Sequence, residues 1–360
     1  MNMKLKGRDK YIMLKRKPII LLLILVLVAS LAFYPMESYI SKPGGAYELT
    51  PFVEVQGGDE DDEGKMSLLT ISLAKATPLT YAYAKIVDNQ KIYKASQIRN
   101  ADEDEQEYNI RQLKLMSDSQ FNAISVAFDR ANKPYKVINN GIFIFNVLKD
   151  SAADGILEPG DKIIGMDNLT ELTEEKLKTY LSEKGQGAVV QLTVERDGET
   201  LEKEVTLKSI PGVLEKPGIG ISYTEDKKVE TTPVVHMNSE DIGGPSAGLM
   251  FTLEILNQLI PEDISKGYNI AGTGEMKPDG TVGRIGGIDL KVIAADRKGI
   301  EIMFAPDDEI DPSILANNPD LTTNYEEALK SAKKIDTKMK IVPVRTIDDA
   351  LAYLDQLEPK

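Results

Sequence analysis

Ser246 lies in a tight, glycine-rich stretch and is the first residue of this chain that stands out as a nucleophile. Residues 243–251 read GGPSAGLMF, which contains G-x-S-x-G, a pattern that often presents a nucleophilic serine on a turn before a helix. Apolar residues follow at helical spacing: Leu249, Leu253, Leu256 and Ile260. Ser246 is therefore expected at a helix N-terminus, where the backbone N–H groups of Ser246 and Ala247 favour an oxyanion.

A serine nucleophile needs a base, and this chain offers few. It has no cysteine and one histidine, His236. An α/β-hydrolase places its acid and histidine after the serine in chain order, and no histidine follows Ser246 here. That reaction scheme is excluded. His236 lies ten residues before Ser246 on a strand-like stretch, and it stays a candidate base.

A lysine can also act as the base if its amine is neutral. Burial lowers the pKa of a lysine from its usual value of about 10.4. Lys291 is expected to share one helical face with the apolar residues Ile288, Val292 and Ala295. A lysine on such a face either snorkels to solvent or has a function, and the spacing alone favours snorkelling.

Three motifs together resemble a known family. GGPSAG is followed by Thr273-Gly274-Glu275, and then by GRIGGIDLKVIAA over residues 283–295. The order and spacing are similar to those of the proteolytic domain of Lon proteases, over about 120 residues, a normal size for one domain. The resemblance implies a Ser-Lys dyad with Ser246 as nucleophile and Lys291 as general base. It also implies that the hydroxyl of Thr273 lies near the amine and orients it.

Two features depart from that family. Many Lon enzymes carry an acid three residues before the serine, where this chain has Gly243, and Glu240 or Asp241 is the nearby substitute. Lon itself also carries an ATPase, but these 360 residues contain no G-x-x-x-x-G-K-[ST] phosphate-binding loop. We therefore expect no ATP-driven unfolding, so that only segments that are already extended reach the serine.

Residues 135–210 are expected to form a compact, β-rich module. The run GILEPGDKII over residues 155–164 resembles the PDZ domain, especially the bacterial kind attached to proteases. PDZ domains add an extended peptide as a strand and often hold its C-terminal carboxylate in a backbone nest. The resemblance places this carboxylate loop at Asn140-Gly141-Ile142, before a strand. The alternative is that the module packs against its neighbours and binds nothing.

The N-terminus predicts a membrane anchor. Residues 1–17 hold seven basic residues and one acid, a net charge of +6, and residues 19–34 carry no charge. This pattern favours a cytoplasmic tail over residues 1–17 and an uncleaved transmembrane anchor over 18–36. The alternative is a signal peptide cleaved near Ser30 and Ala32. The rest of the chain carries −20, which makes it a poor partner for nucleic acid or anionic lipid.

The expected fold class is mixed α/β (α+β), with an anchor, an extracytoplasmic region of no assigned role over 37–134, the PDZ module and a Lon-type domain over 219–358. This layout resembles the membrane-anchored, ATP-independent PDZ–Lon proteases of Gram-positive bacteria. The resemblance implies an extracytoplasmic serine endopeptidase on the cell membrane, with small membrane or exported peptides as substrates. We expect no cofactor, metal or nucleic acid. A homo-oligomer is a further expectation, since Lon-type domains often form hexamers. The rival interpretation is a non-catalytic, membrane-tethered PDZ adaptor.

Overall fold

The computed structural model describes the chain except residues 1–4, 59–62, 101–102, 211–216, 240–241 and 311. Its contacts divide the chain into two compact units. One unit comprises residues 1–44 and 71–100, and the other comprises residues 45–70 and 101–360. Each unit is described separately below.

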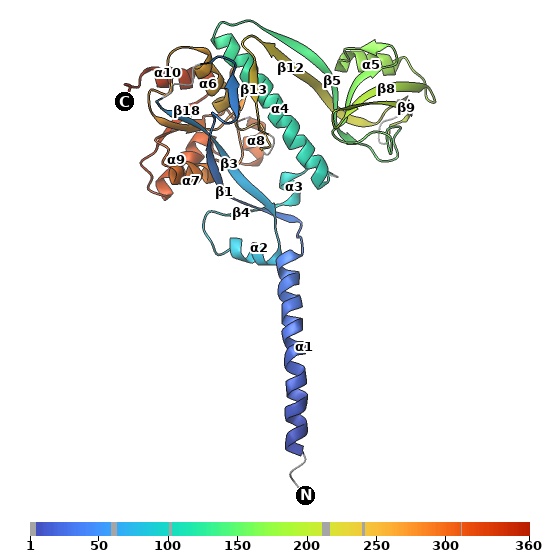
Figure 1. Cartoon of the computed structure of the whole chain (residues 1–360), viewed down its shortest axis with the longest axis vertical. Coiled ribbons are helices and arrows are strands. Elements are labelled where there is room, and N and C mark those ends of the chain that lie inside the picture. The colour runs from blue at the N-terminus through green and yellow to red at the C-terminus, as the bar shows by residue number, and fades with distance from the viewer. Residues whose placement is uncertain (1–4, 59–62, 101–102, 211–216, 240–241, 311) are drawn as a thin grey trace. The chain divides into compact units, whose positions relative to one another are not determined.

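A parallel sheet organises the larger unit (Figure 1). Its strands lie in the order β18 (Lys340–Val344), β17 (Ile302–Pro306), β14 (Asn269–Gly272) and β3 (Lys65–Lys75), with β3 paired to β14 over residues 65–68. Side chains alternate between the two faces, as the period of a strand requires. Phe304 packs into one buried cluster, and its neighbours Met303 and Ala305 pack into another. Both faces are therefore buried, which is usual for a parallel sheet.

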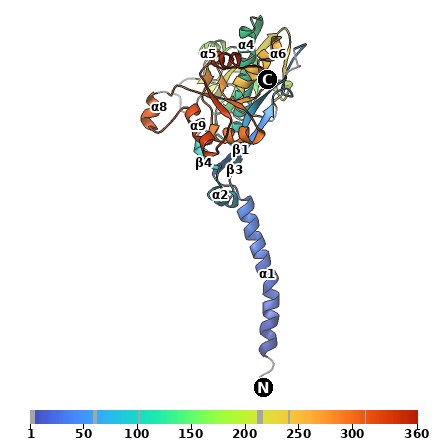
Figure 2. The same cartoon turned by 90° about the vertical axis from the view of Figure 1, so that its left-hand side faces the viewer.

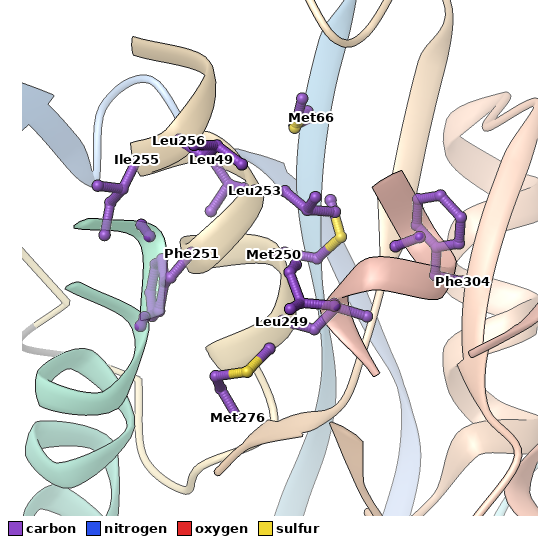
Figure 3. Packing of buried hydrophobic residues seen from close by; sticks show 14 of the residues in the cluster. Leu49, Met66, Leu249, Met250, Phe251, Leu253, Ile255, Leu256, Met276 and Phe304 are labelled. Atoms are coloured by element: carbon purple, nitrogen blue, oxygen red, sulfur yellow. The ribbon is translucent and has the colours of Figure 1, made fainter. Parts of the chain in front are cut away.

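Helices supply the rest of both clusters. One cluster contains residues of α4 (Glu105–Arg130), α6 (Gly248–Leu259) and α10 (Ile347–Asp355), and the other contains residues of α7 (Ile288–Lys298) and α9 (Asn324–Lys334). Helix α6 is buried from Gly248 to Gln258, so apolar residues occupy more than one stripe of it. Phe251 points toward α4, and Met250 and Leu253 point toward the strands (Figure 3). The helix that follows Ser246 is thus fixed on several sides.

The PDZ-like module has its own sheet and its own buried cluster. The strand order is β12 (Ile221–Thr231), β5 (Tyr135–Val147), β6 (Lys162–Met166), β8 (Val189–Arg196) and β9 (Glu199–Thr206), with β7 (Leu169–Thr170) paired to β6. Helix α5 (Glu174–Ser182) contributes Leu177 to a cluster that includes Ile142, Ile163 and Leu192. The module is therefore built around a separate core.

Short elements complete the larger unit. They are β2 (Val53–Val55), β10 (Lys208–Ser209), β11 (Pro217–Gly218), β13 (Val235–Met237), β15 (Glu275–Met276), β16 (Val282–Gly283) and α8 (Pro312–Asn317). Strand β2 pairs with β13, β10 with β11, and β15 with β16.

Two expected boundaries differ from the structure. Residues 37–134 do not form a separate region, because β2, β3 and α4 contribute to the same buried cluster as α6. Strand β12 was expected in the last domain, over 219–358, but it pairs with β5 along its length and belongs to the sheet of the module. The PDZ-like module is therefore inserted into a second domain whose elements lie on both sides of it in the sequence.

The smaller unit contains α1 (Leu5–Phe33), α2 (Pro78–Ala84), β4 (Lys91–Lys94), α3 (Ala95–Ile98) and the first part of β1 (Ser38–Glu48). Strand β4 pairs with β1 from Ser38 to Ser41. Helix α1 is continuous in both views (Figures 1 and 2). In the part of the chain that the structure describes, no helix combines the length and the apolar character needed to cross a membrane.

The contact between α4 and α6 makes a stability prediction. Phe251 is completely buried, so Phe251→Ala should lower the free energy of unfolding by about 3–5 kcal/mol through lost burial and an unfilled cavity. Leu329 on α9 is 42% exposed, and Leu329→Ala should change this free energy by only about 0.5 kcal/mol. Urea unfolding followed by circular dichroism measures both. Similar losses in the two variants would contradict the packing described here.

Candidate active site

The turn before α6 presents Ser246. Gly244 has a φ of 85°, a left-handed conformation that favours glycine. Ala247 is the N-cap of α6, and Ser246 directly before it is partly exposed. A Cβ on Gly248 would lie 2.7 Å from both the Met276 nitrogen and Ser119 Oγ, so only glycine fits there without movement. The two glycines of G-x-S-x-G therefore serve the turn and the close packing behind it.

Lys291 reaches this serine from the first turn of α7. Gly287, the N-cap of α7, has a φ of 67°, and the helix begins at Ile288. The Lys291 side chain is buried, and its Nζ lies 2.7 Å from Ser246 Oγ and 2.8 Å from Thr273 Oγ1. The snorkelling alternative for Lys291 is thus wrong, because the amine points inward to two hydroxyls.

Burial also sets the protonation state of this amine. Desolvation lowers the pKa of Lys291 from 10.5 to about 7, since the pocket disfavours the ammonium form. A large fraction of the amine is therefore neutral near pH 7, and a neutral amine beside a serine hydroxyl can accept its proton.

Thr273 orients both partners of the dyad. Its hydroxyl donates to the Ser246 carbonyl oxygen at 3.0 Å, which leaves an oxygen lone pair facing the Lys291 amine. The Gly274 N–H donates to the same carbonyl at 2.9 Å. Thr273 is completely buried, so these bonds form away from solvent. The serine main chain and the lysine amine are thereby fixed by one hydroxyl.

Two backbone N–H groups at the turn are available to an oxyanion. Among the described residues, no acceptor binds the N–H of Ser246 or of Ala247. Both lie at the start of α6, where the helix dipole favours negative charge. Both N–H groups are therefore placed to donate to the oxyanion of a tetrahedral intermediate.

Helix α4 holds the turn before α6 through hydrogen bonds that no sequence motif predicts. The Gln112 carbonyl accepts the Gly244 N–H at 2.9 Å, and Ser119 Oγ donates to the Pro245 carbonyl at 2.9 Å. Asn122 Nδ2 donates to the Met276 carbonyl at 2.9 Å. The available sequence signal was small polar residues, Ser119 and Asn122, three apart in a helix-like stretch.

The other sequence candidates do not meet Ser246. His236 is exposed on β13, where it pairs with Glu54 of β2, and the amine at Ser246 is that of Lys291. Glu240 and Asp241 lie outside the described residues. A Cβ on Gly243 would lie 2.9 Å from Gln112 Cβ, which gives a steric reason for glycine at the position where many Lon enzymes carry an acid.

The predicted peptide loop of the module is wrong. Asn140, Gly141 and Ile142 lie inside β5, and β5 pairs with β12 on one side and with β6 on the other. Ile142 is fully buried and faces Glu225 of β12 and Ile163 of β6 in the two registers. No free strand edge exists at that point, so a peptide cannot be added there. The extra residues at Asn140-Gly141 form an irregularity in the pairing with β12.

A groove of about 510 Å³ lies instead between α5 and β12. Its lining residues include Leu177 and Leu181 of α5, together with Ile219, Ile221 and Tyr223. Strand β12 is the last strand of the described sheet on this side. The Gly-Ile-Gly-Ile run at 218–221 leads into this edge strand, outside the predicted module over 135–210.

The backbone before β12 has the character of an anion nest. The carbonyl oxygens of Ile219 and Gly220 accept the N–H groups of Ala153 at 2.9 Å and Leu148 at 3.0 Å. Within the described part of the chain, no acceptor binds the N–H of Ile219 or Gly220. Gly220 has a φ of 81°, and consecutive N–H groups at such a bend suit a carboxylate.

A metal site needs several ligand side chains close together. In the described ranges, no group of three or more His, Asp or Glu side chains is placed to hold an ion.

Comparison with known proteins identifies the same two domains, although the first matched range begins within α4 and the second includes most of β12, which the structure pairs with β5. Residues 123–207 match the PDZ domain, and residues 223–354 match the Lon protease (S16) C-terminal proteolytic domain. Lon proteases of Acinetobacter baumannii (strain AB307-0294) and Neorickettsia sennetsu (strain ATCC VR-367 / Miyayama) are 33% and 34% identical over 42% and 31% of this chain. The chain spans only 18% and 11% of the lengths of these two curated relatives.

Similar solved structures include two that each cover about a quarter of this chain. The PDZ domain of an SdrC-like protein from Listeria monocytogenes is 25% identical over 24% of this chain and 92% of its own, with a TM-score of 0.23. A solution structure from Geobacillus thermodenitrificans is 34% identical over 23% of this chain and 95% of its own, with a TM-score of 0.21. The chain thus carries a PDZ domain over 123–207 and, over 223–354, a Lon-type proteolytic domain, the catalytic domain of a serine peptidase.

Proposed function

We propose that the protein is an ATP-independent, membrane-anchored serine endopeptidase that cleaves extended segments of small membrane or exported peptides. The observation that carries the peptidase assignment is the distance of 2.7 Å between the buried Lys291 amine and Ser246 Oγ. A scaffold has no use for a desolvated amine at that position. The absence of a phosphate-binding loop in these 360 residues supports ATP independence.

The reaction follows from the geometry of the site. Ser246 Oγ attacks the peptide carbonyl carbon while neutral Lys291 takes the hydroxyl proton, and the N–H groups of Ser246 and Ala247 bind the oxyanion. The ammonium of Lys291 then gives its proton to the leaving amine as the C–N bond breaks. Neutral Lys291 next activates a water that attacks the acyl-enzyme ester, which releases the carboxylate and restores the serine.

The membrane location rests on the N-terminal helix. Residues of α1 from Ile19 to Val28 are each at least 52% exposed although all are large and apolar. Exposure of such an apolar helix surface is unfavourable in water and favourable in the hydrocarbon core of a bilayer. The basic residues before it orient the N-terminus toward the cytoplasm, so the catalytic domain lies on the outer side of the cell membrane. A homo-oligomer stays a prediction.

The PDZ domain recruits substrate in this proposal. An extended peptide adds to the outer edge of β12, an apolar C-terminal side chain enters the groove beside Leu181, and the N–H groups of Ile219 and Gly220 bind the carboxylate. Binding in this groove raises the local concentration of substrate and supplies no chemistry.

The dyad makes a mutational prediction. Ser246→Ala and Lys291→Ala should each reduce kcat at least about a thousandfold, and the double variant should be no worse, because residues that act as one unit are non-additive. His236→Ala is the control and should retain most activity, since His236 is exposed and away from the amine contact. Turnover of a short fluorogenic peptide measures all four. Independent partial losses that multiply in the double variant would indicate another base, and no turnover by the wild type would favour the adaptor interpretation.

The pKa of Lys291 makes a pH prediction. Because this pKa is lowered to about 7, kcat/KM should rise along a single ascending limb that is half complete near that pH and level well below 10.5. Lys291→Arg should be inactive, since a guanidinium does not deprotonate in this range. Thr273→Val should lower the rate, because the amine loses an orienting hydroxyl. If the rise of kcat/KM with pH is absent in His236→Ala, the assignment of Lys291 as the base is contradicted.

The groove makes a binding prediction. A peptide ending in a free apolar residue should bind at least about tenfold more tightly than its C-terminal amide, because the amide cannot fill the nest as an anion. Leu181→Glu should remove this preference by placing a like charge in the groove. Val189→Glu, at a site on β8 that is 50% exposed, is the matched control. Fluorescence anisotropy of labelled peptides measures the affinities. If the wild type binds the free-acid peptide and its C-terminal amide equally well, the proposed carboxylate site is contradicted.

A further inference from the structure

Helix α2 in the smaller unit exposes apolar side chains on one face. Leu79, Tyr83 and Ile86 follow one another at i, i+4 and i+7, so they share a face that extends just past the end of the helix. Their exposed fractions are 55%, 57% and 85%. A single exposed apolar residue needs no explanation, but three on one face of so short a helix form a patch.

The opposite face of α2 is packed, so its orientation is determined. Ala84 joins Ile40 and Ala76 in a small buried cluster, and Tyr81 packs against it. The helix begins at Pro78. Its N-cap residue, Thr77, forms a capping box with Thr80, and this box stabilises the start of the helix. The exposed patch therefore belongs to a folded element with a defined inner side.

This patch lies next to the end of the apolar helix α1. The Met36 N–H donates to the Ala76 carbonyl at 2.8 Å, and the Ala76 N–H donates to the Ser38 carbonyl at 2.8 Å. These bonds join the chain just after α1 to the residue before the α2 cap, and α1 and α2 are in contact. Helix α2 lies across the end of α1 in both views (Figures 1 and 2). If α1 crosses a bilayer, α2 lies along its surface.

The ends of the two helices carry aromatic side chains. Phe33 and Tyr34 are 81% and 67% exposed at the end of α1, and Tyr83 is exposed on α2. Tyrosines concentrate at the level of the lipid headgroups, where the ring is apolar and the hydroxyl is wet. This level is the one that the end of a spanning helix reaches.

The smaller unit, apart from residues 1–33, has a net charge of opposite sign to that of the larger unit. Residues 34–44 and 71–100 hold six basic residues and two acids, a net charge of +4. Residues 1–17 carry +6 and residues 18–33 carry none, so the remaining residues, 45–70 and 101–360, carry −24. Lys42, Lys85 and Lys94 are exposed. Lysines beside an apolar surface attract anionic headgroups.

We propose that the α2 face formed by Leu79, Tyr83 and Ile86 docks on the outer surface of an anionic bilayer, as an interfacial helix beside the α1 anchor. This inference rests on the proposed anchor and goes beyond it. The sequence as a whole predicts repulsion from anionic lipid, and the smaller unit reverses that prediction locally. The apolar face enters the boundary between headgroups and acyl chains, and the lysines bind phosphate groups. The tilt of the smaller unit on the membrane is thereby restricted.

The chain lacks tryptophan, so a single introduced indole reports on one position. The full-length protein carrying Tyr83→Trp, Leu27→Trp or Val189→Trp is reconstituted in vesicles of phosphatidylcholine with phosphatidylglycerol. Lipids brominated either high on the acyl chains or near their ends then quench the indole according to its depth. Leu27 is 58% exposed in α1 and tests the anchor, and Val189 is 50% exposed on the PDZ domain and serves as the control.

The expected result is that the Tyr83→Trp protein loses more than half of its emission to the shallow bromines and little to the deep ones. The Leu27→Trp protein should be quenched most by the deep bromines, and the Val189→Trp protein by neither. Quenching at position 27 without quenching at position 83 would overturn the docking proposal and leave the anchor intact. Quenching at neither position would overturn both. If the indole at position 83 is not quenched but its emission shifts to shorter wavelength, a protein surface covers it instead of lipid. This result would also overturn the proposal.

Charge gives an independent arm of the test. Adding Lys42→Glu and Lys85→Glu to the Tyr83→Trp protein should reduce the shallow quenching severalfold in vesicles with phosphatidylglycerol, and high salt should do the same to the parent. Lys333→Glu with Lys334→Glu changes the net charge equally on exposed residues of α9 and should have no effect. An equal effect of both pairs would show that only net charge matters and would overturn the local role of the basic residues.

Discussion

The chemistry depends on a lysine amine that is deprived of water. An exposed lysine stays charged near neutrality and cannot accept a proton from a serine. Burial of Lys291 lowers its pKa to about 7, and this has a cost in stability. Between pH 7 and 10.5 the unfolded chain binds the proton more readily than the folded one, so stability is fully present above pH 10.5 and is lost as the pH falls through about 7. The apolar clusters on both faces of the sheet must offset this cost.

Because the Lys291 amine must be buried beside the serine, the proteolytic domain is assembled from segments that lie far apart in the sequence. The serine turn is held by α4, the lysine by α7 and the orienting hydroxyl by the end of β14. Helix α4 precedes the PDZ domain in the chain, whereas the other two follow it. The inserted domain leaves and rejoins the proteolytic domain through the paired strands β5 and β12. The peptide that we propose at the edge of β12 would thus contact a strand that is continuous with the proteolytic domain.

Local signals in the sequence were accurate where the physics is local. The spacing of Leu249, Leu253 and Leu256 correctly predicted the helix that begins directly after Ala247. The dyad was identified through the order of three motifs, because spacing alone favoured a solvated lysine. Ser119 was missed because its partner, the Pro245 carbonyl, lies 126 residues away in sequence. The carboxylate loop predicted at Asn140-Gly141-Ile142 was wrong for a similar reason: β5 pairs with β12, which lies far away in sequence, and no local pattern shows which strand is at the edge.

The most direct measurement is the pKa of Lys291 itself. Lysines labelled with ¹³C beside the amine are titrated by NMR in the folded, full-length protein, and the signal of Lys291 is assigned from its loss in Lys291→Arg. We predict that the Lys291 signal titrates near pH 7 in the folded protein. A Lys291 signal that titrates near 10.5 in the folded protein would contradict the account, because the amine would then be charged whenever the enzyme works.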